Sequence, residues 1–290
     1  ARRVCRGQRR GIGLFRTEFL FMENTQIPSE EEQFEAYKKT AVMMDGKEVI
    51  IRTLDVGGDK NIPYLGMEKE DNPFLGFRAV RYCLDRKEMY KIQLRALIRA
   101  SVFGKIKIMI PLVTCVNELR EVKALVEDIK ADLDRENIPY DKNISVGVMI
   151  ETPAASEIAD LLAKEADFFS IGTNDLTQYT MAVDRGNSKV AYLYSVYNPA
   201  VIRSIKRIIS AAANENIIAG MCGEAAADPL LTPPLISFGL KEFSVNASSI
   251  LRTRAQIAKW TKAEADKVAD EVMKCATQEE VYEILKRYER

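Results

Sequence analysis

Phe168-Phe169-Ser170-Ile171-Gly172-Thr173-Asn174-Asp175 opens the stretch that decides the fold of this chain, and the stretch continues to Arg185. Its apolar start predicts a short buried strand that ends at Gly172, and the polar turn after it predicts a helix that carries Arg185. Backbone N–H groups at such a junction have no partner within the helix, so they can hold a carboxylate or a phosphate. Asp175 can act there as a helix cap, as a metal ligand, or as both in turn. The simpler alternative is a plain cap followed by a surface arginine.

The same pattern, an apolar strand that ends in polar residues, recurs along the chain. Strands are predicted over 11–15, 48–51, 105–113, 146–150, 168–172, 217–221 and 242–245. Helices are predicted over 29–44, 86–103, 116–135, 154–164, 199–215 and 248–290. Apolar strands that alternate with helices indicate a parallel sheet covered on both faces. About seven such units favour an α/β fold, a (β/α)8 TIM-type barrel in a single domain, over an open doubly wound sheet. Residues 75–80 are the candidate for the eighth strand.

The amino-acid composition limits the size of the core and the kinds of partner that this chain can have. The chain has 290 residues, of which 47% are hydrophobic, so it can bury a large core. Lys plus Arg and Asp plus Glu both number 42, which gives no reason to expect nucleic acid as a partner. No apolar run reaches the length of a membrane span and no leader opens the chain, so we expect no membrane insertion and a cytoplasmic location.

The cysteine and histidine content limits the kinds of catalytic and metal site that are possible. The five cysteines are widely spread, with no Cys-x-x-Cys pair, which suits a reducing compartment. The chain contains no histidine, so histidine-based triads and histidine-ligated zinc are excluded. Residues 1–10 are basic and show no period, and we predict a disordered arm or linker remnant there rather than a functional basic tail. Residues 11–290 are predicted to form the folded domain.

The polar residues that follow the strands predict a site. In a parallel barrel all strands present their C-terminal ends on one face, where the chemistry of such folds lies. Two or three arginines can bind one phosphate through forked donors, and two carboxylates suit Mg²⁺ completed by substrate oxygens and water. The alternative for each carboxylate is a salt bridge to an arginine, and the alternative for Cys222 is a buried core thiol. As a protonated thiol, Cys222 could instead donate a proton to a carbanion. The residues just past the strand ends are Arg16, Glu18, Arg52, Asp55, Glu151, Asn174, Asp175, Cys222 and Glu224.

Six motifs in order resemble a known family. The sequence is similar to the C-terminal, phosphoenolpyruvate-binding domain of enzyme I of the bacterial phosphoenolpyruvate:sugar phosphotransferase system, from about residue 11 to the end. Gly57-Gly58-Asp59-Lys60 and the run from Tyr179 to Arg185 resemble enzyme I more than the related dikinases. The motifs lie at residues 11–20, 52–60, 72–78, 148–153, 171–184 and 220–224.

The resemblance implies a phosphoenolpyruvate-protein phosphotransferase activity and a role for each matching residue. Arg16, Arg52 and Arg185 would hold the phosphate with Arg78 close by, and Asn174 and Asp175 would meet the substrate. Glu151 and Asp175 would bind Mg²⁺, and Cys222 would protonate the enolate to give pyruvate. The resemblance also implies a homodimer formed through the barrel. The phosphoryl acceptor would be a histidine on a separate N-terminal domain, which passes the group to the phosphocarrier protein.

Three other functions remain open from the sequence. The first is a fragment of a pyruvate phosphate dikinase or phosphoenolpyruvate synthase, which shares the barrel. The second is a magnesium-dependent aldolase or lyase that acts on oxo-acids, and the third is a dimerisation scaffold without catalysis.

Overall fold

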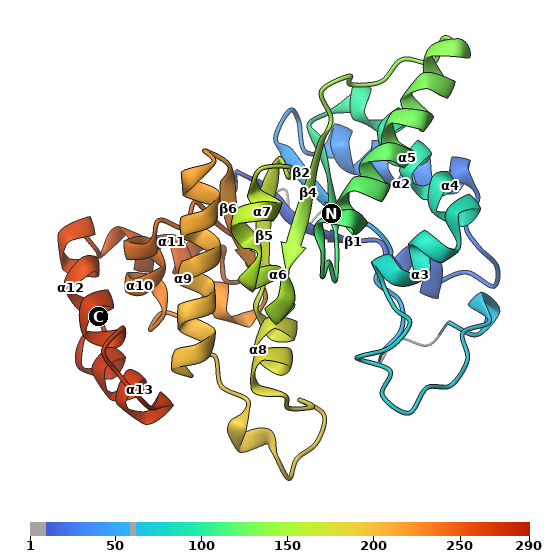
Figure 1. Cartoon of the computed structure of the whole chain (residues 1–290). Helices are drawn as coiled ribbons and strands as arrows, with labels where there is room; N and C mark the ends of the chain where they lie inside the picture. Colours follow the sequence, from blue (N-terminus) through green and yellow to red (C-terminus); the bar gives the residue numbers. More distant parts are fainter. Residues whose placement is uncertain (1–9, 59–61) are drawn as a thin grey trace. The chain divides into compact units, whose positions relative to one another are not determined.

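The computed structural model describes residues 10–58 and 62–290 of the chain (Figure 1). The predicted arm at residues 1–10 therefore lies almost wholly outside the described residues, as do Asp59 and Lys60. The chain divides into two compact units, Ala1–Val148 and Met149–Arg290.

The first unit contains strands β1 (Gly11–Arg16), β2 (Glu48–Arg52) and β3 (Ile106–Ile110), and most of β4 (Ser145–Ile150). Each strand pairs with the next and runs parallel to it, and Arg16 lies opposite Arg52. The buried parts of these strands carry β-branched residues such as Ile51 and Ile108. The helices of this unit are α1 (Glu18–Met22), α2 (Glu30–Met43), η2 (Pro63–Leu65), α3 (Val80–Asp85), α4 (Lys87–Ala100), η3 (Ser101–Phe103) and α5 (Val116–Arg135).

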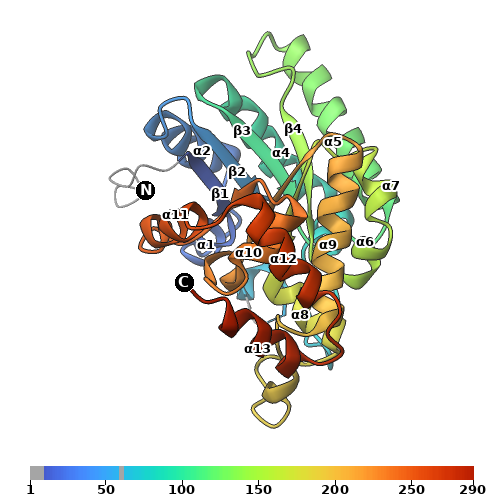
Figure 2. The ribbon, with the colours of Figure 1, turned by 90° about the vertical axis from the view of Figure 1, so that its left-hand side faces the viewer.

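The second unit contains β5 (Phe168–Gly172), β6 (Ile218–Cys222) and the short β7 (Glu242–Phe243). These strands are also parallel and follow the order of the sequence, with Gly172 opposite Cys222. Figure 2 shows the ribbon turned by 90°, with α9 as one long helix. The helices are α6 (Pro153–Glu157), α7 (Ala159–Ala163), α8 (Thr173–Met181), η4 (Ala191–Leu193), α9 (Pro199–Asn214), η5 (Glu224–Ala227), α10 (Thr232–Phe238), α11 (Ile250–Ala258), α12 (Lys262–Val272) and α13 (Gln278–Arg287).

The predicted α/β class of the TIM-barrel type is confirmed, because parallel strands alternate with helices and each strand pairs with its sequence neighbour in both units. The predicted eighth strand is wrong. Residues 75–78 form turns, in which the Leu75 N–H donates to the Asn72 carbonyl at 2.9 Å. Ala79 then takes a positive φ of 52° and α3 begins at Val80. A short turn and a left-handed residue cannot continue a strand.

Four other predictions need correction. Arg185 does not lie on a helix, because α8 ends at Met181 and Ala182 takes the left-handed conformation. Asp175 is not a helix cap: Gly172 occupies the cap position and no side chain caps the helix. The predicted helix over 154–164 is two short helices, and the helical C-terminus is three. Short non-helical breaks such as 259–261 separate helices that the amphipathic pattern alone joins.

The start of α2 shows how local sequence sets an element boundary. The Glu32 N–H donates to Ser29 Oγ at 3.3 Å, and the Ser29 N–H donates to Glu32 Oε2 at 2.7 Å. This reciprocal pair is a capping box. Among the described residues, no helix is both long and apolar enough to cross a membrane.

Ser29→Ala tests this cap. We expect the free energy of unfolding to fall by about 1 kcal/mol, because one helix N–H loses its acceptor. The Ser29 N–H and hydroxyl also donate to the Glu32 carboxylate and lower its pKa, so the stability from these two bonds is present above the usual carboxyl pKa of 4.5 and is lost as the pH falls through the lowered value. Urea unfolding at neutral and acidic pH measures both effects. Ser188→Ala in an exposed turn is the control, and equal stability of the two variants at neutral pH would contradict the prediction.

Candidate active site

Two arginines end neighbouring strands of the first unit. Arg16 and Arg52 are register partners at the C-terminal ends of β1 and β2, and the Thr17 hydroxyl donates to the Arg52 carbonyl at 2.9 Å. Arg16 is exposed, and its guanidinium lies 4.7 Å from the centre of the Phe19 ring. Two guanidinium groups therefore lie at one edge of the sheet, as the sequence predicted.

Arg52 is part of a buried chain of four charges. Its Nη2 lies 2.7 Å from Glu18 Oε1 and its Nη1 lies 2.8 Å from Asp55 Oδ2. Asp55 also binds Arg78, with 2.8 Å between Arg78 Nη2 and Asp55 Oδ1. All four side chains are at most 8% exposed. Because an isolated buried charge costs several kcal/mol, the alternation of sign is what permits this burial.

Gly57 allows the chain to approach Arg78. It has a φ of +100°, and a Cβ atom at this position would lie 2.5 Å from Arg78 Cβ. The Ala79 N–H donates to the Val56 carbonyl at 3.1 Å, which joins the two segments. Gly57 thus lets Arg78, which binds Asp55, lie close to this segment.

In the second unit, Glu151 lies against the end of β5. It follows β4 and is 3% exposed. A Cβ atom on Gly172 would lie 2.6 Å from Glu151 Oε2 and 2.9 Å from Glu151 Cβ. Gly172 thus leaves the space that the carboxylate occupies.

Asn174, Asp175 and Arg185 lie together at the start of α8. Arg185 Nη1 is 3.3 Å from Asp175 Oδ1, and the Arg185 N–H donates to Gln178 Oε1 at 3.1 Å. The salt bridge is the alternative that the sequence left open for this carboxylate. Tyr194, from the irregular segment after α8, donates its hydroxyl to the Asn174 carbonyl at 3.1 Å. Burial raises the pKa of Tyr194, and the Arg185 charge partly opposes this. The sequence did not predict a role for Tyr194, because no local pattern marks a tyrosine in an irregular segment as part of a site.

Cys222 ends β6 opposite Gly172 and is 3% exposed. Its carbonyl accepts a hydrogen bond from Thr173 Oγ1 at 3.2 Å. The next residue, Gly223, has a φ of +101°, and a Cβ atom there would lie 2.5 Å from Thr173 Oγ1. The Glu224 N–H then donates to Asn174 Oδ1 at 3.5 Å. This turn brings the predicted thiol and the predicted substrate-binding amide to adjacent strand ends.

The described residues contain no group of three or more histidine, cysteine, aspartate or glutamate side chains that could hold a metal. In the second unit, Glu151 just after β4 and Asp175 on α8 supply hard oxygen donors. A pair of this kind suits a cation that takes its remaining ligands from water and substrate, as Mg²⁺ does.

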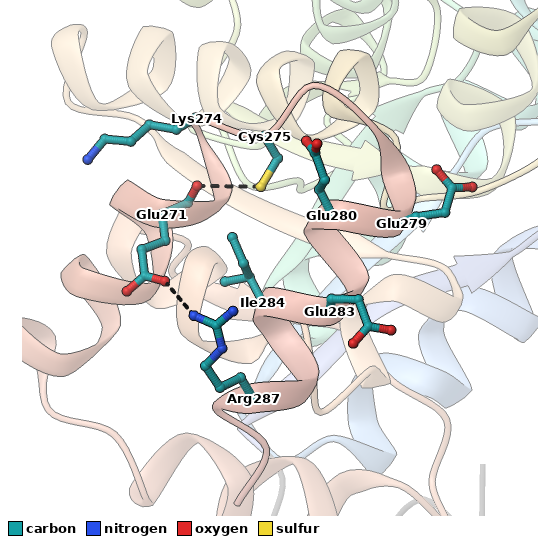
Figure 3. Close-up of a pocket in the computed structure, with 8 residues that line it drawn as sticks. All are labelled: Glu271, Lys274, Cys275, Glu279, Glu280, Glu283, Ile284 and Arg287. Carbon is teal, nitrogen blue, oxygen red and sulfur yellow. Dashed lines mark hydrogen bonds and ion pairs between the residues drawn. The ribbon is translucent and has the colours of Figure 1, made fainter.

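A separate cavity of about 600 Å³ lies between α12 and α13 (Figure 3). Four glutamates line it, and none of the predicted site residues does. The Cys275 thiol donates to the Glu271 carbonyl at 3.5 Å, and burial raises its pKa. An acidic lining repels phosphate. The complete lining is Glu271, Lys274, Cys275, Glu279, Glu280, Glu283, Ile284 and Arg287.

The structure therefore gathers the predicted residues into two groups, one in each unit. Arg16, Arg52 and Arg78 lie together in the first, although Arg52 and Arg78 are each paired with a carboxylate. The second unit holds the other group, which consists of Glu151, Asn174, Asp175, Arg185 and Cys222.

Comparison with curated proteins gives close relatives. The phosphoenolpyruvate-protein phosphotransferase of Geobacillus stearothermophilus is 53% identical over 277 residues, which are 96% of this chain and 48% of that protein. The protein of the same name from Staphylococcus carnosus is 51% identical over 278 residues, again 96% of this chain and 48% of the relative. The chain thus spans about half the length of these relatives.

Solved structures of similar fold are much more distant in sequence. A citrate lyase from Burkholderia xenovorans aligns with a TM-score of 0.52 at 13% identity, over 96% of this chain and 90% of that one. An aldolase/citrate lyase family protein from Burkholderia cenocepacia aligns with a TM-score of 0.50 at 14% identity, over 89% and 96%. These two support the fold alone.

The family of the PEP-binding domain of PEP-utilising enzymes matches residues 1–262. With this match and relatives of more than half identity, the chain belongs to the PEP-utilising enzymes, as their PEP-binding domain.

Proposed function

We propose that this chain binds phosphoenolpyruvate with Mg²⁺ and gives the phosphoryl group to a histidine on a separate domain, with release of pyruvate. The observation that carries the proposal is the pairing of Gly172 with Cys222. In support of it, the buried Glu151 carboxylate lies against Gly172, α8 begins directly after Gly172, and Cys222 lies opposite it. Carboxylate, thiol and helix start are the groups that a metal-bound enol phosphate requires.

The arginines are the proposed phosphate ligands. Arg16 is exposed and Arg185 is partly exposed, so both can reach an anion. The buried carboxylates at Glu18 and Asp55 fix the Arg52 and Arg78 side chains, which reduces the entropy lost when a phosphate binds. Catalysis would then consist mainly of positioning and of stabilising charge on the transferred group.

Glu151 and Asp175 are the proposed Mg²⁺ ligands. Their donor atoms are hard oxygens, and Gly172 keeps the space beside Glu151 open. When bound, Mg²⁺ would neutralise charge on the phosphoryl oxygens. Asn174 would orient the substrate from the start of α8.

Cys222 is the proposed acid. A thiol S–H group can give its proton to the methylene carbon of the enolate. Low exposure protects the enolate from competing reactions with water.

The partners belong to the same proposal. This sequence contains no histidine, so the phosphoryl acceptor must lie elsewhere. We propose an N-terminal phosphohistidine domain that serves the phosphocarrier protein, a homodimer formed through the barrel, and a cytoplasmic setting. The four described cysteines are all free thiols, which supports a reducing compartment. The names of the relatives favour this function over a dikinase or synthase fragment.

Calorimetry of phosphoenolpyruvate binding, with and without Mg²⁺, tests the substrate site. Each charged hydrogen bond contributes about 1.5–3 kcal/mol, so Arg16→Ala and Arg52→Ala should weaken affinity by roughly 10- to 100-fold. Arg52→Ala leaves two buried carboxylates without this partner, so its folding is checked by circular dichroism. Arg135→Ala, at the exposed end of α5, is the control. Equal affinities in all variants and without Mg²⁺ would refute the proposal.

Gly172→Ala tests the metal ligands without removal of a carboxylate. The new methyl group would displace Glu151, so we expect phosphoenolpyruvate affinity to lose its dependence on Mg²⁺, as in Glu151→Gln. The measurement is a Mg²⁺ titration at fixed phosphoenolpyruvate. A Gly172→Ala variant that responds to Mg²⁺ as the wild type does would show that Glu151 is not a ligand.

Cys222→Ser separates binding from proton transfer. A hydroxyl is a much weaker acid than a thiol, so pyruvate release with an added histidine domain should fall by about 10²- to 10⁴-fold. Phosphoenolpyruvate affinity should change by less than about twofold, because the thiol does not bind the phosphate. Cys275→Ser is the control for loss of a buried thiol. Full activity of Cys222→Ser would exclude this residue as the acid.

A further inference from the structure

The thiol of Cys222 has a neighbour that the proposed function does not use. The Ser170 hydroxyl donates to Cys222 Sγ at 3.5 Å, from β5 to β6. Ser170 is 3% exposed and lies between Phe169 and Ile171 in an otherwise apolar strand. A buried hydroxyl costs free energy unless it is hydrogen-bonded, so this bond accounts for a serine at a position suited to packing.

In the register of β5 and β6, Ser170 and Cys222 are diagonal neighbours, and each of them lies opposite a glycine. Ser170 pairs with Gly220, and Gly172 pairs with Cys222. Because side chains alternate along a strand, Ser170 and Gly172 share one face, as do Gly220 and Cys222. A Cβ atom on Gly220 would lie 3.2 Å from Glu242 Cβ. The two glycines therefore leave the hydroxyl and the thiol facing each other without an intervening side chain.

Cys222 makes two further hydrogen bonds to residues at and just after the end of β5. Its thiol donates to the Ile171 carbonyl at 3.6 Å, while its own carbonyl accepts from Thr173 Oγ1 at 3.2 Å. To give its proton to a substrate, the S–H group must leave the Ile171 carbonyl. The Ser170 bond does not involve that proton, so it can persist while the S–H rotates.

We propose that Ser170 is a positioning residue for Cys222, which rests on the proposed role of Cys222 as the acid. In the step, the S–H bond breaks and a C–H bond forms from the electron pair of the enolate at its methylene carbon. The sulfur keeps its pair as a thiolate and later regains a proton from water. The Ser170 hydroxyl holds the sulfur at the strand end throughout. Its hydrogen bond becomes charge-assisted once the proton has left.

The elements next to β5 and β6 in this unit also carry charged residues. Glu151 follows β4, Asp175 and Arg185 lie on and after α8, Glu224 follows β6, and Glu242 lies on β7. A substitution at Ser170 removes none of them. A change in thiol behaviour in Ser170 variants is therefore due to the hydroxyl.

Labelling with iodoacetamide, resolved by residue with mass spectrometry, tests the contact without any catalysis. Thiolate is the reacting form, so Ser170→Ala should lower Cys222 labelling by about five- to tenfold relative to Cys115. Cys115 is exposed and serves as the internal standard. Ser170→Thr keeps a hydroxyl and should restore labelling to within about twofold. An unchanged or faster rate in Ser170→Ala, or no restoration in Ser170→Thr, would overturn the proposal.

Pyruvate release with an added histidine domain gives the second measurement. Ser170→Ala should lower kcat by about tenfold and leave KM for phosphoenolpyruvate within about twofold, because only the proton-transfer step loses an interaction. A rise in KM with unchanged kcat would overturn the positioning role. Failure of the wild type to release pyruvate would instead count against the proposed function, and the labelling experiment would still decide whether Ser170 acts on Cys222.

Discussion

The absence of a side chain at Gly172 is the constraint on which the second unit depends. Gly172 ends β5, occupies the cap position of α8 and pairs with Cys222. A Cβ atom there would collide with the Glu151 carboxylate. One residue without a side chain thus lets a carboxylate, a helix start and a thiol occupy adjacent strand ends. Larger residues would satisfy the strand and still leave no room for Glu151.

In the first unit the main constraint is the burial of four charged side chains. Glu18, Arg52, Asp55 and Arg78 alternate in sign, and none lies far from an opposite charge. Such a chain contributes little net stability, because desolvation offsets most of the attraction. Its effect is to fix the orientation of two guanidinium groups. Arg16 lies beside this network and remains exposed, which leaves it available to a ligand.

Family membership and geometry make different contributions. Relatives of more than 50% identity establish which family the chain belongs to, but they span twice its length. The geometry explains how particular residues can cooperate, and it identifies two that motifs do not reveal. Tyr194 contacts the start of α8 from a loop, and Ser170 contacts the thiol from within a strand.

The sequence by itself determined the class of fold, the approximate positions of the strands and the residue types of the candidate site. Apolar strand runs, helical periods and the Ser29 capping box are local signals, so neighbouring residues suffice to read them. Only the tertiary structure decided that residues 75–78 form turns and that Arg185 lies beyond α8. The tertiary structure alone showed that Asp55 forms ion pairs with two arginines and that the Ser170 hydroxyl donates to Cys222 Sγ. These features depend on register, positive φ angles and contacts between distant segments, which no local pattern encodes.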